Sequence, residues 1–276
     1  MKVSYLGPKG SFSEIALSTY FRNNITAIPM PSIGDVFQAV VKNESTYGII
    51  PIENSIEGSV NNSHDLLIES NVLISGEIEL AINQCLLSKN SSKENINILY
   101  SHSQSLAQCQ NWIKTNLPEI KIVPVISNSE GAAMIKTNNE ACIGSQKLSK
   151  DYDLNVLEYN IQDFPDNTTR FLIIGQEQTD KSSNNKTSII VSPSNTSDSG
   201  SLFKVLEPFA NHNVSLSRIE SRPSKMGKWS YVFFIDLEGH ISDESIINAL
   251  SELKQLDIQY KNLGSYPVSS DSKLNK

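Results

Sequence analysis

The chain has 276 residues, enough for two domains, and its 38% hydrophobic and 19% charged residues are typical of a globular protein. Its formal net charge of −7 argues against a general nucleic-acid-binding protein, which needs a basic face. The three cysteines (Cys85, Cys109, Cys142) contain no C-x-x-C pair, so neither a disulfide framework nor a structural zinc site is indicated. The N-terminus lacks a signal-peptide core, and no apolar run approaches the roughly 20 residues of a membrane span, so a cytoplasmic protein is expected.

The N-terminal segment predicts a strand, a glycine loop and a capped helix. Residues 3–6 read as a short strand that Gly7-Pro8-Lys9-Gly10 ends. Ser11-Phe12-Ser13-Glu14 has the Ser-x-x-Glu spacing of a capping box, so a helix is expected from there to about residue 21. Free N–H groups at such a helix start suit an anion, although any α/β protein has turns of this kind.

A second polar cluster follows the strand predicted at residues 47–51. Glu53, Asn54, Ser55 and Ser59 crowd the junction between this strand and the next helix, where solvated caps are the simpler interpretation. Glu53 stands between the apolar residues Ile52 and Ile56, however, so partial burial of its carboxyl is predicted. A buried carboxyl has a raised pKa and can hold a proton near neutrality.

A second lobe is expected to begin near residue 90. The helix after the strand at residues 96–100 places Leu106, Cys109 and Ile113 on one face, and Cys109 is interpreted as a core residue. His102 fits a hydrogen bond at the helix start or a ligand contact, and the first is preferred. Strands and helices alternate as far as residue 175, which predicts parallel sheets with helices on both faces and a cleft between two lobes.

The segment at residues 163–171, DFPDNTTRF, leads into an apolar run at residues 171–175 that reads as a buried strand. A loop that enters a sheet is a usual place for ligand contacts in α/β proteins. Arg170 can bind a carboxylate through two parallel hydrogen bonds, and Thr169 offers a hydroxyl donor beside it. On these residues alone, a capped turn with a surface ion pair is the simpler interpretation.

A second module is predicted after the polar stretch at residues 176–186, QEQTDKSSNNK, which contains no apolar residue and reads as a linker. From residue 187 the order of predicted elements is βαββαβ, the ferredoxin-like arrangement. The residues from 269 onward are expected to form a mobile tail.

Motifs along nearly the whole chain resemble the prephenate dehydratase family, in the family's order. They are Gly7-Pro8-Lys9-Gly10-Ser11-Phe12-Ser13-Glu14, Pro51-Ile52-Glu53-Asn54-Ser55, Gly58-Ser59-Val60, Ser101-His102 with Gln108-Cys109, and Thr169-Arg170-Phe171. The C-terminal module resembles an ACT regulatory domain, and Glu220-Ser221-Arg222-Pro223 matches the phenylalanine-responsive signature of that family.

The resemblance implies an α/β catalytic domain at residues 1–176, with two lobes like a type 2 periplasmic binding protein. A linker at 177–186, an ACT domain at 187–268 and a tail at 269–276 would follow. It further implies decarboxylating dehydration of prephenate to phenylpyruvate, CO2 and water in L-phenylalanine biosynthesis, without a cofactor or metal. No chorismate mutase segment precedes Met1, so a monofunctional enzyme is expected.

The resemblance also assigns residues. Its catalytic candidates are Thr169, Glu53, Asn54 and Gln108. Thr169 would donate a hydrogen bond to the departing hydroxyl, and Glu53, if buried, would be the better proton source. The substrate-binding candidates are Ser11, Phe12, Ser13, Ser55, Gly58, Ser59, Arg170 and Phe171, with Arg170 on a carboxylate and Phe171 against the ring.

L-Phenylalanine is the effector that the resemblance implies, bound between paired ACT modules of a homodimer or homotetramer. The candidate contacts are Gly200, Ser201, Leu202, Glu220, Ser221, Arg222 and Pro223. The family usually has Pro-Gly-Ala-Leu where this chain has Ser199-Gly200-Ser201-Leu202, which leaves the strength and identity of the effector open. An assembly module without an effector site is the alternative.

Three functions other than prephenate dehydratase remain as alternatives. Arogenate dehydratase performs the same chemistry on the aminated substrate, and nothing in the sequence separates the two. A non-catalytic amino-acid sensor would keep Arg170 but could dispense with Thr169. A secreted solute-binding protein conflicts with the missing signal peptide. Neither nucleic acid nor a membrane is expected as a partner.

Overall fold

The computed structural model describes residues 1–22, 24–193, 199–224 and 231–268. The chain forms two compact units, each assembled from separate stretches of sequence. Met1–Ala39, Gly48–Ser63 and Glu79–Phe171 make up the first, and Val40–Tyr47, His64–Ile78 and Leu172–Lys276 make up the second. The tail predicted to be mobile, residues 269–276, lies outside the described residues. Within these residues, the helices are too short or too polar to cross a membrane.

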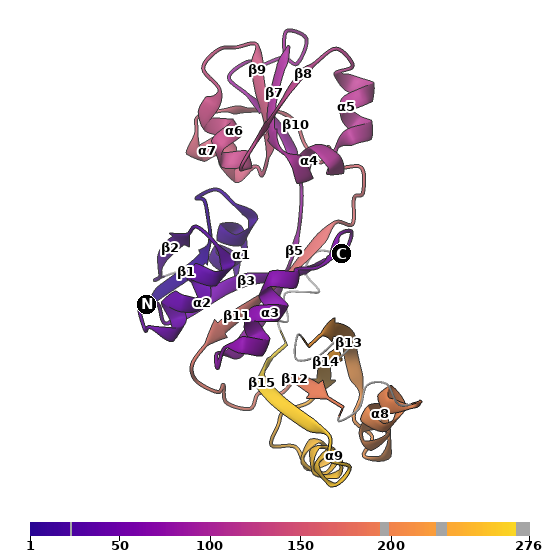
Figure 1. Cartoon of the computed structure of the whole chain (residues 1–276). Coiled ribbons are helices and arrows are strands. Elements are labelled where there is room, and N and C mark those ends of the chain that lie inside the picture. Colours follow the sequence, from indigo (N-terminus) through magenta and orange to yellow (C-terminus); the bar gives the residue numbers. More distant parts are fainter. Residues whose placement is uncertain (23, 194–198, 225–230, 269–276) are drawn as a thin grey trace. The chain divides into compact units, whose positions relative to one another are not determined.

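The first sheet has the strand order β2-β1-β3-β11-β5, with β4 paired to β3 (Figure 1). Its strands are β1 (Lys2–Leu6), β2 (Thr26–Met30), β3 (Tyr47–Asn54), β4 (Gly58–Ser59), β5 (Leu73–Ala81) and β11 (Thr168–Gly175). The helices that accompany them are α1 (Phe12–Phe21), α2 (Ile33–Val41) and α3 (Asn61–Glu69). The interior strand β11 reads as a continuous apolar run, and its residues Phe171, Leu172, Ile173 and Ile174 are all at most 2% exposed.

The second sheet has the order β10-β6-β9-β7-β8. Its strands are β6 (Cys85–Ser88), β7 (Ile98–His102), β8 (Lys121–Val125), β9 (Glu140–Gly144) and β10 (Asn155–Glu158). Strands β7, β8 and β9 are parallel, whereas β6 is antiparallel to both of its neighbours. The sheet is therefore mixed where the alternation of elements predicted a parallel one, because β6 reaches it directly from β5 without a helical crossover.

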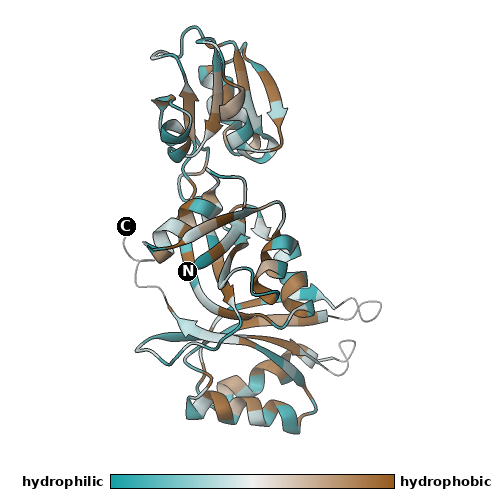
Figure 2. Cartoon of the chain, turned by 90° about the vertical axis from the view of Figure 1, so that its left-hand side faces the viewer, coloured by the Kyte–Doolittle hydropathy of each residue, from teal (hydrophilic) through white to brown (hydrophobic). Residues whose placement is uncertain are grey.

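Helices cover both faces of this second sheet. They are α4 (Ser103–Gln108), α5 (Gln110–Asn116), α6 (Asn128–Met134) and α7 (Lys147–Asp151). Side chains of α4 and α5 pack with Leu86, Leu99 and Ile143, and those of α6 and α7 pack with Cys85, Leu87 and Cys142. Successive residues of β6 alternate between the two clusters, as the period-two geometry of a strand requires. Figure 2 shows hydrophobic residues concentrated in the strands of the sheets.

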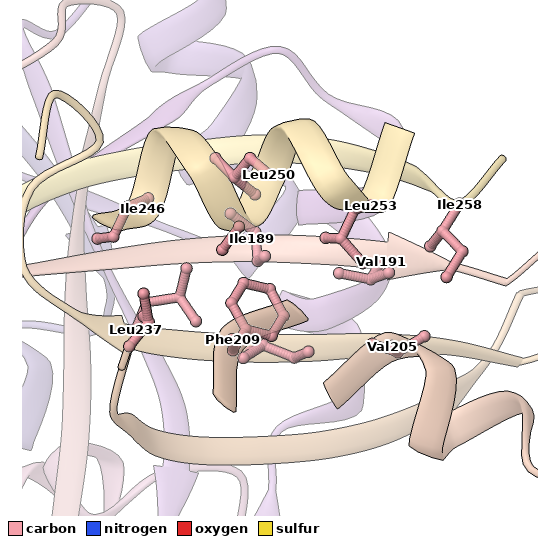
Figure 3. Packing of buried hydrophobic residues seen from close by; sticks show 12 residues of the cluster. Ile189, Val191, Val205, Phe209, Leu237, Ile246, Leu250, Leu253 and Ile258 are labelled. Carbon is pink, nitrogen blue, oxygen red and sulfur yellow. The ribbon is translucent and has the colours of Figure 1, made fainter. Parts of the chain in front are cut away.

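The C-terminal sheet has the order β13-β14-β12-β15, with antiparallel pairs throughout. Its elements, in chain order, are β12 (Asn185–Ser192), α8 (Ser201–Asn211), β13 (Leu216–Pro223), β14 (Tyr231–Glu238), α9 (Glu244–Gln255) and β15 (Gln259–Pro267). This order confirms the predicted βαββαβ arrangement. Both helices pack against one face of the sheet, where Phe209 and Leu250 meet Ile189 and Val191 (Figure 3).

The opposite face of that sheet packs against α3 and β5, which precede it by more than 100 residues in sequence. Lys261 of β15 donates hydrogen bonds to the carbonyl oxygens of Leu67 and Ile68, each at 2.9 Å, and to that of Ser70. Lys186 of β12 lies 2.6 Å from the Glu77 carboxylate. These contacts explain why the second unit combines parts of α3 and β5 with the ferredoxin-like module.

Candidate active site

A cavity of about 560 Å³ lies within the first unit and is lined from both of its sheets. The first sheet contributes Leu6, Gly7, Pro8, Gly10, Ser11, Phe12, Ser13, Ile33, Pro51, Asn54, Glu57, Gly58, Ser59, Val60, Thr169 and Phe171. The segment after β5 and the second sheet contribute Ile82, Gln84, His102, Gln104, Ser105, Gln108, Ile126, Ser127, Asn128, Ser129 and Ser145. Among these described lining residues there is neither a lysine nor an arginine. Apart from the Glu57 carboxylate and the His102 ring, the polar side chains that an anion would meet here are hydroxyls and amides.

The loop between β1 and α1 forms one wall. The Ser11 hydroxyl oxygen accepts from the backbone N–H of Glu14 at 3.4 Å, as the predicted cap requires. The loop is held against the second sheet by two hydroxyls, since Ser129 donates to the Lys9 carbonyl at 2.6 Å and Ser145 to the Gly10 carbonyl at 3.1 Å. Gly10 has a φ of 85°, and a Cβ there would clash with the Leu148 side chain. Glycine at this position allows the close approach.

Asn54 and Thr169 meet at the ends of neighbouring strands. The Asn54 Oδ1 accepts from the backbone N–H groups of Ile56 at 3.0 Å and Glu57 at 3.1 Å, which identifies Nδ2 as the other side-chain atom. That Nδ2 donates to Thr169 Oγ1 at 2.9 Å and to Asn167 Oδ1 at 2.7 Å. The Thr169 oxygen is thus an acceptor in this contact. Within the described part of the chain, its hydroxyl proton has no acceptor and remains available to a ligand.

Buried amides and a hydroxyl form the opposite wall. Gln108 donates to the Glu57 carboxylate at 2.9 Å, and Gln104 donates to its other oxygen. Gln84 donates through Nε2 to Ser105 Oγ at 3.2 Å and to Gln108 Oε1 at 3.3 Å. The segment carrying Gln84 lies beside the strand carrying Thr169, because the Ile82 N–H donates to the Asn167 carbonyl at 2.7 Å.

His102 caps α4 and also lines the cavity. Its Nδ1 accepts from the backbone N–H of Gln104 at 3.3 Å, so the preferred interpretation as a helix-start hydrogen bonder describes what the ring does here. Asn128, at the start of α6, accepts from the His102 N–H at 3.0 Å and donates to Ser105 Oγ at 2.8 Å. Two helix starts are joined in this way at the cavity wall.

The structure brings nine of the predicted catalytic and substrate-binding residues to the cavity: Ser11, Phe12, Ser13, Asn54, Gly58, Ser59, Gln108, Thr169 and Phe171. Glu53, Ser55 and Arg170 are not among its lining residues. Glu53 and Arg170 are half-buried and occupy alternate positions on β3 and β11, next to Asn54 and Thr169. Successive side chains of a strand point to opposite faces, so Arg170 points away from the face of β11 that Thr169 and Phe171 share. Glu53 does not line the cavity, although Pro51 on the same side of β3 does. Ser55 is exposed and accepts from the Thr168 N–H at 3.0 Å.

Sequence reasoning missed several polar residues of the cavity: Glu57, Gln84, Gln104, Ser105, Asn128 and Ser129. Four of them follow strands β7 and β8 directly, where polar residues open a helix, and that position was the available signal. Gln84 had a weaker signal, an amide immediately before the buried run of β6.

The predicted effector residues lie in two places of the C-terminal module. Gly200, with a φ of 79°, precedes α8, which begins with Ser201 and Leu202. Glu220, Ser221, Arg222 and Pro223 end β13, where exposure alternates. The half-buried Arg222 lies 3.4 Å from Asp65, and Glu220 lies 3.9 Å from His64. Two residues of the signature therefore face α3.

Comparison with known proteins places both modules in families. Residues 3–179 match the family described as prephenate dehydratase, and residues 189–255 match the ACT domain. The bifunctional chorismate mutase/prephenate dehydratase of Pseudomonas aeruginosa is 43% identical over 97% of this chain and 73% of its own length. The prephenate dehydratase of Bacillus subtilis is 34% identical over 96% of this chain and 98% of its own length. The crystal structure of prephenate dehydratase from Arthrobacter aurescens in complex with L-Phe has a TM-score of 0.87 at 30% identity, over 99% of this chain and 91% of that one.

Proposed function

The chain belongs to the prephenate dehydratase family and carries an ACT domain, and we propose how its cavity performs the reaction of that family. It is a hydro-lyase of aromatic amino-acid biosynthesis that acts on prephenate, and the similarities do not favour arogenate as the substrate. Membership of this family also argues against the other two alternatives, a non-catalytic amino-acid sensor and a secreted solute-binding protein.

The reaction breaks two bonds of the substrate. The bond from the ring to its carboxylate breaks with release of CO2, and its electron pair enters the ring. As the ring becomes aromatic, the bond from C4 to its hydroxyl breaks, and the hydroxide that leaves takes one proton from solvent to become water. Because the ring becomes aromatic, the enzyme needs to position the dianion and stabilise the charge that develops on the leaving oxygen.

The hydrogen bond from Asn54 to Thr169 carries this proposal. Since the Thr169 oxygen accepts from the Asn54 amide, its proton is directed toward the cavity and donates to the leaving hydroxyl. A threonine hydroxyl is a poor acid, so Thr169 acts by polarising the carbon–oxygen bond rather than by giving up its own proton. Asn54 orients Thr169 and does not require contact with the substrate.

Neutral donors hold the two carboxylates. The start of α1 presents the backbone N–H groups of Phe12 and Ser13 at the positive end of the helix dipole, whereas the Ser11 N–H donates to the Pro8 carbonyl at 3.2 Å. Gly58 and Ser59 of β4 and Phe171 also line the cavity, where Gly58 and Ser59 would bind polar groups and Phe171 would lie against the ring. This proposal assigns no direct substrate contact to Glu53, Ser55 or Arg170, because none of them lines the cavity.

Regulation by L-phenylalanine is proposed for the ACT domain. The relative from Arthrobacter aurescens was solved with L-Phe, which supports this effector. Gly200, Ser201 and Leu202 would approach the effector's backbone, and the end of β13 would complete the site in a homodimer or homotetramer formed through ACT domains. Glu220 and Arg222 face α3, so the same strand would carry the effect toward the catalytic residues as a coupling free energy of about 1–3 kcal/mol. A cytoplasmic location is part of this proposal.

Turnover of purified protein with prephenate, with and without L-phenylalanine, tests both parts. Phenylpyruvate is followed by its absorbance in alkali. Turnover that L-phenylalanine inhibits is expected. Turnover without a response would overturn the effector assignment and leave the catalytic one standing. A folded protein that is inert toward prephenate would overturn the catalytic assignment, and arogenate as a second substrate would then show whether the amino group is required.

A further inference from the structure

Gln84 holds a buried hydrogen-bond acceptor whose partner is missing from the described structure. The residue is 1% exposed and lines the cavity. Its Oε1 makes no hydrogen bond to any described group, although its backbone N–H and its Nε2 are both satisfied. Buried polar atoms in folded proteins are almost always paired, so an unpaired one at the wall of a binding cavity points to a ligand.

Glu57 determines which atom of the Gln84 amide is left over. A carboxylate oxygen can only accept, so Gln108 must turn its Nε2 toward Glu57 Oε1, 2.9 Å away. The Oε1 of Gln108 then faces Gln84 and can only accept. Gln84 must therefore donate through its Nε2, which lies 3.3 Å from Gln108 Oε1. The unpaired atom of Gln84 is therefore its oxygen.

The contacts of Ser105 and Asn128 agree with this orientation of the Gln84 amide. The Asn128 Oδ1 accepts from the backbone N–H of His102 at 3.0 Å, so its Nδ2 is the atom that donates to Ser105 Oγ at 2.8 Å. Ser105 Oγ also accepts from Gln84 Nε2 at 3.2 Å. The Gln84 NH2 group thus donates to both acceptors within its reach. If the amide were reversed, the Ser105 hydroxyl could donate to it instead, but two amide oxygens would face each other at Gln108.

We propose that Gln84 is a substrate-binding residue whose side-chain oxygen accepts a hydrogen bond from the 4-hydroxyl of prephenate. The inference rests on the proposed function. Prephenate as a dianion carries two carboxylates, a ketone and this hydroxyl, and only the hydroxyl can donate. A carboxylate next to Gln84 Oε1 would be repelled, so the acceptor also disfavours the reversed orientation of the substrate.

The leaving hydroxyl would then make one hydrogen bond to Gln84 and one to Thr169, which belong to different walls of the cavity. Gln84 accepts a hydrogen bond from the 4-hydroxyl, which turns a lone pair of the hydroxyl oxygen toward Thr169. Thr169 donates to that lone pair. The segments carrying the two residues are neighbours, since Ile82 N–H meets the Asn167 carbonyl at 2.7 Å. A neutral amide performs this task without adding a negative charge beside a dianion.

Gln84→Met tests the assignment because methionine keeps the length of the side chain and removes its hydrogen bonds. Steady-state kinetics with prephenate would be compared with competitive inhibition by phenylpyruvate, which keeps the carboxylate and ketone of the side chain but lacks the hydroxyl. We expect kcat/KM to fall about tenfold to a hundredfold. The inhibition constant of phenylpyruvate should stay close to that of the wild type. Gln110→Met, the same exchange on an exposed residue of the same lobe, is the control and should change neither value.

An unchanged kcat/KM in folded Gln84→Met would overturn the proposal. An equal loss of kcat/KM and of phenylpyruvate binding would also overturn it, because it would show a structural role without recognition of the hydroxyl. If Gln84→Met does not fold, Gln84→Asn keeps the amide but withdraws it by one methylene, and the same two outcomes apply. A wild-type protein without any turnover would instead refute the proposed function, so the two failures are distinguishable.

Discussion

The side-chain amide of Asn54 donates to the hydroxyl oxygen of Thr169 at 2.9 Å, joining the ends of β3 and β11 across 115 positions of sequence. The direction of this hydrogen bond matters more than its length. An amide donor uses a lone pair of the threonine oxygen and leaves the hydroxyl proton for the substrate. The backbone N–H groups of Ile56 and Glu57 impose that direction on Asn54.

Asn54→Asp reverses the hydrogen bond without changing the shape of the side chain. A carboxylate cannot donate, so the Thr169 hydroxyl would donate to Asp and lose its contact with the leaving group. We expect kcat for prephenate to fall by about 10² to 10³, with the fold retained by circular dichroism. Asn248→Asp, on the exposed side of α9, is the matched control. Turnover of Asn54→Asp near the wild-type rate would contradict the assigned direction.

Thr169→Ala removes the donor itself. The expected loss in kcat is again about 10² to 10³, because one hydrogen bond to a developing charge disappears. Thr169→Ser restores the hydroxyl and should recover a large part of the rate. The neighbouring Thr168 donates to the Asp166 carbonyl at 3.3 Å and does not line the cavity, so Thr168→Ala should remain close to wild type. A fully active Thr169→Ala would refute this mechanism.

Lys261→Met should destabilise the protein, because it removes the donor at the C-terminal end of α3. The ammonium group meets the carbonyl oxygens of Leu67, Ile68 and Ser70, which the helix itself leaves unsatisfied. Burial lowers the pKa of Lys261, an indication that this cation is partly removed from water. We expect a loss of about 1–3 kcal/mol in the free energy of unfolding, measured with urea at fixed protein concentration. The exposed Lys114 offers the same substitution as a control, and equal stability of the two variants would exclude the capping role.

The three cysteine thiols should be unreactive in the folded protein. Cys85, Cys109 and Cys142 are each at most 2% exposed. Burial raises the pKa of Cys85 and Cys142, and it raises that of Cys109 to about 12. The thiolate is the reactive form, so a disulfide reagent at pH 8 should label none of them, and a rise to pH 9 should add little. Complete labelling is expected in guanidinium chloride. Rapid labelling of the native protein would contradict this prediction, because it would show that the hydrophobic clusters around the three cysteines open in solution.

The local elements and the family could be predicted from the sequence. Ser11 caps its helix as the Ser-x-x-Glu spacing predicts, and the C-terminal module has the predicted order of strands and helices, because caps and hydrophobic periodicity are local properties. The strand ends were less well determined. The sequence suggested strands at residues 47–51 and 171–175, whereas β3 runs to Asn54 and β11 begins at Thr168.

Those three extra residues at each strand end decide the site. Once Thr169 belongs to a strand, alternation turns Arg170 away from the face that Thr169 and Phe171 share, whereas Glu53 is on the same side of β3 as the cavity residue Pro51. Strand pairing, which the tertiary structure supplies, extended the strands into segments that read as loops. The direction of β6 had no local signal either, since a strand's direction follows from the path of the chain.

The hydrogen-bond directions in the cavity depend on contacts between distant segments and could not be predicted from the sequence. Gln84, Ser105 and Gln108 come from separate segments, and each could donate or accept as an isolated residue. The Glu57 carboxylate can only accept hydrogen bonds, so it determines the orientation of the Gln108 amide. The Gln108 amide in turn determines the orientation of the Gln84 amide. The sequence supplies groups able to bind prephenate, while the packing of distant segments determines which atom of each group faces it.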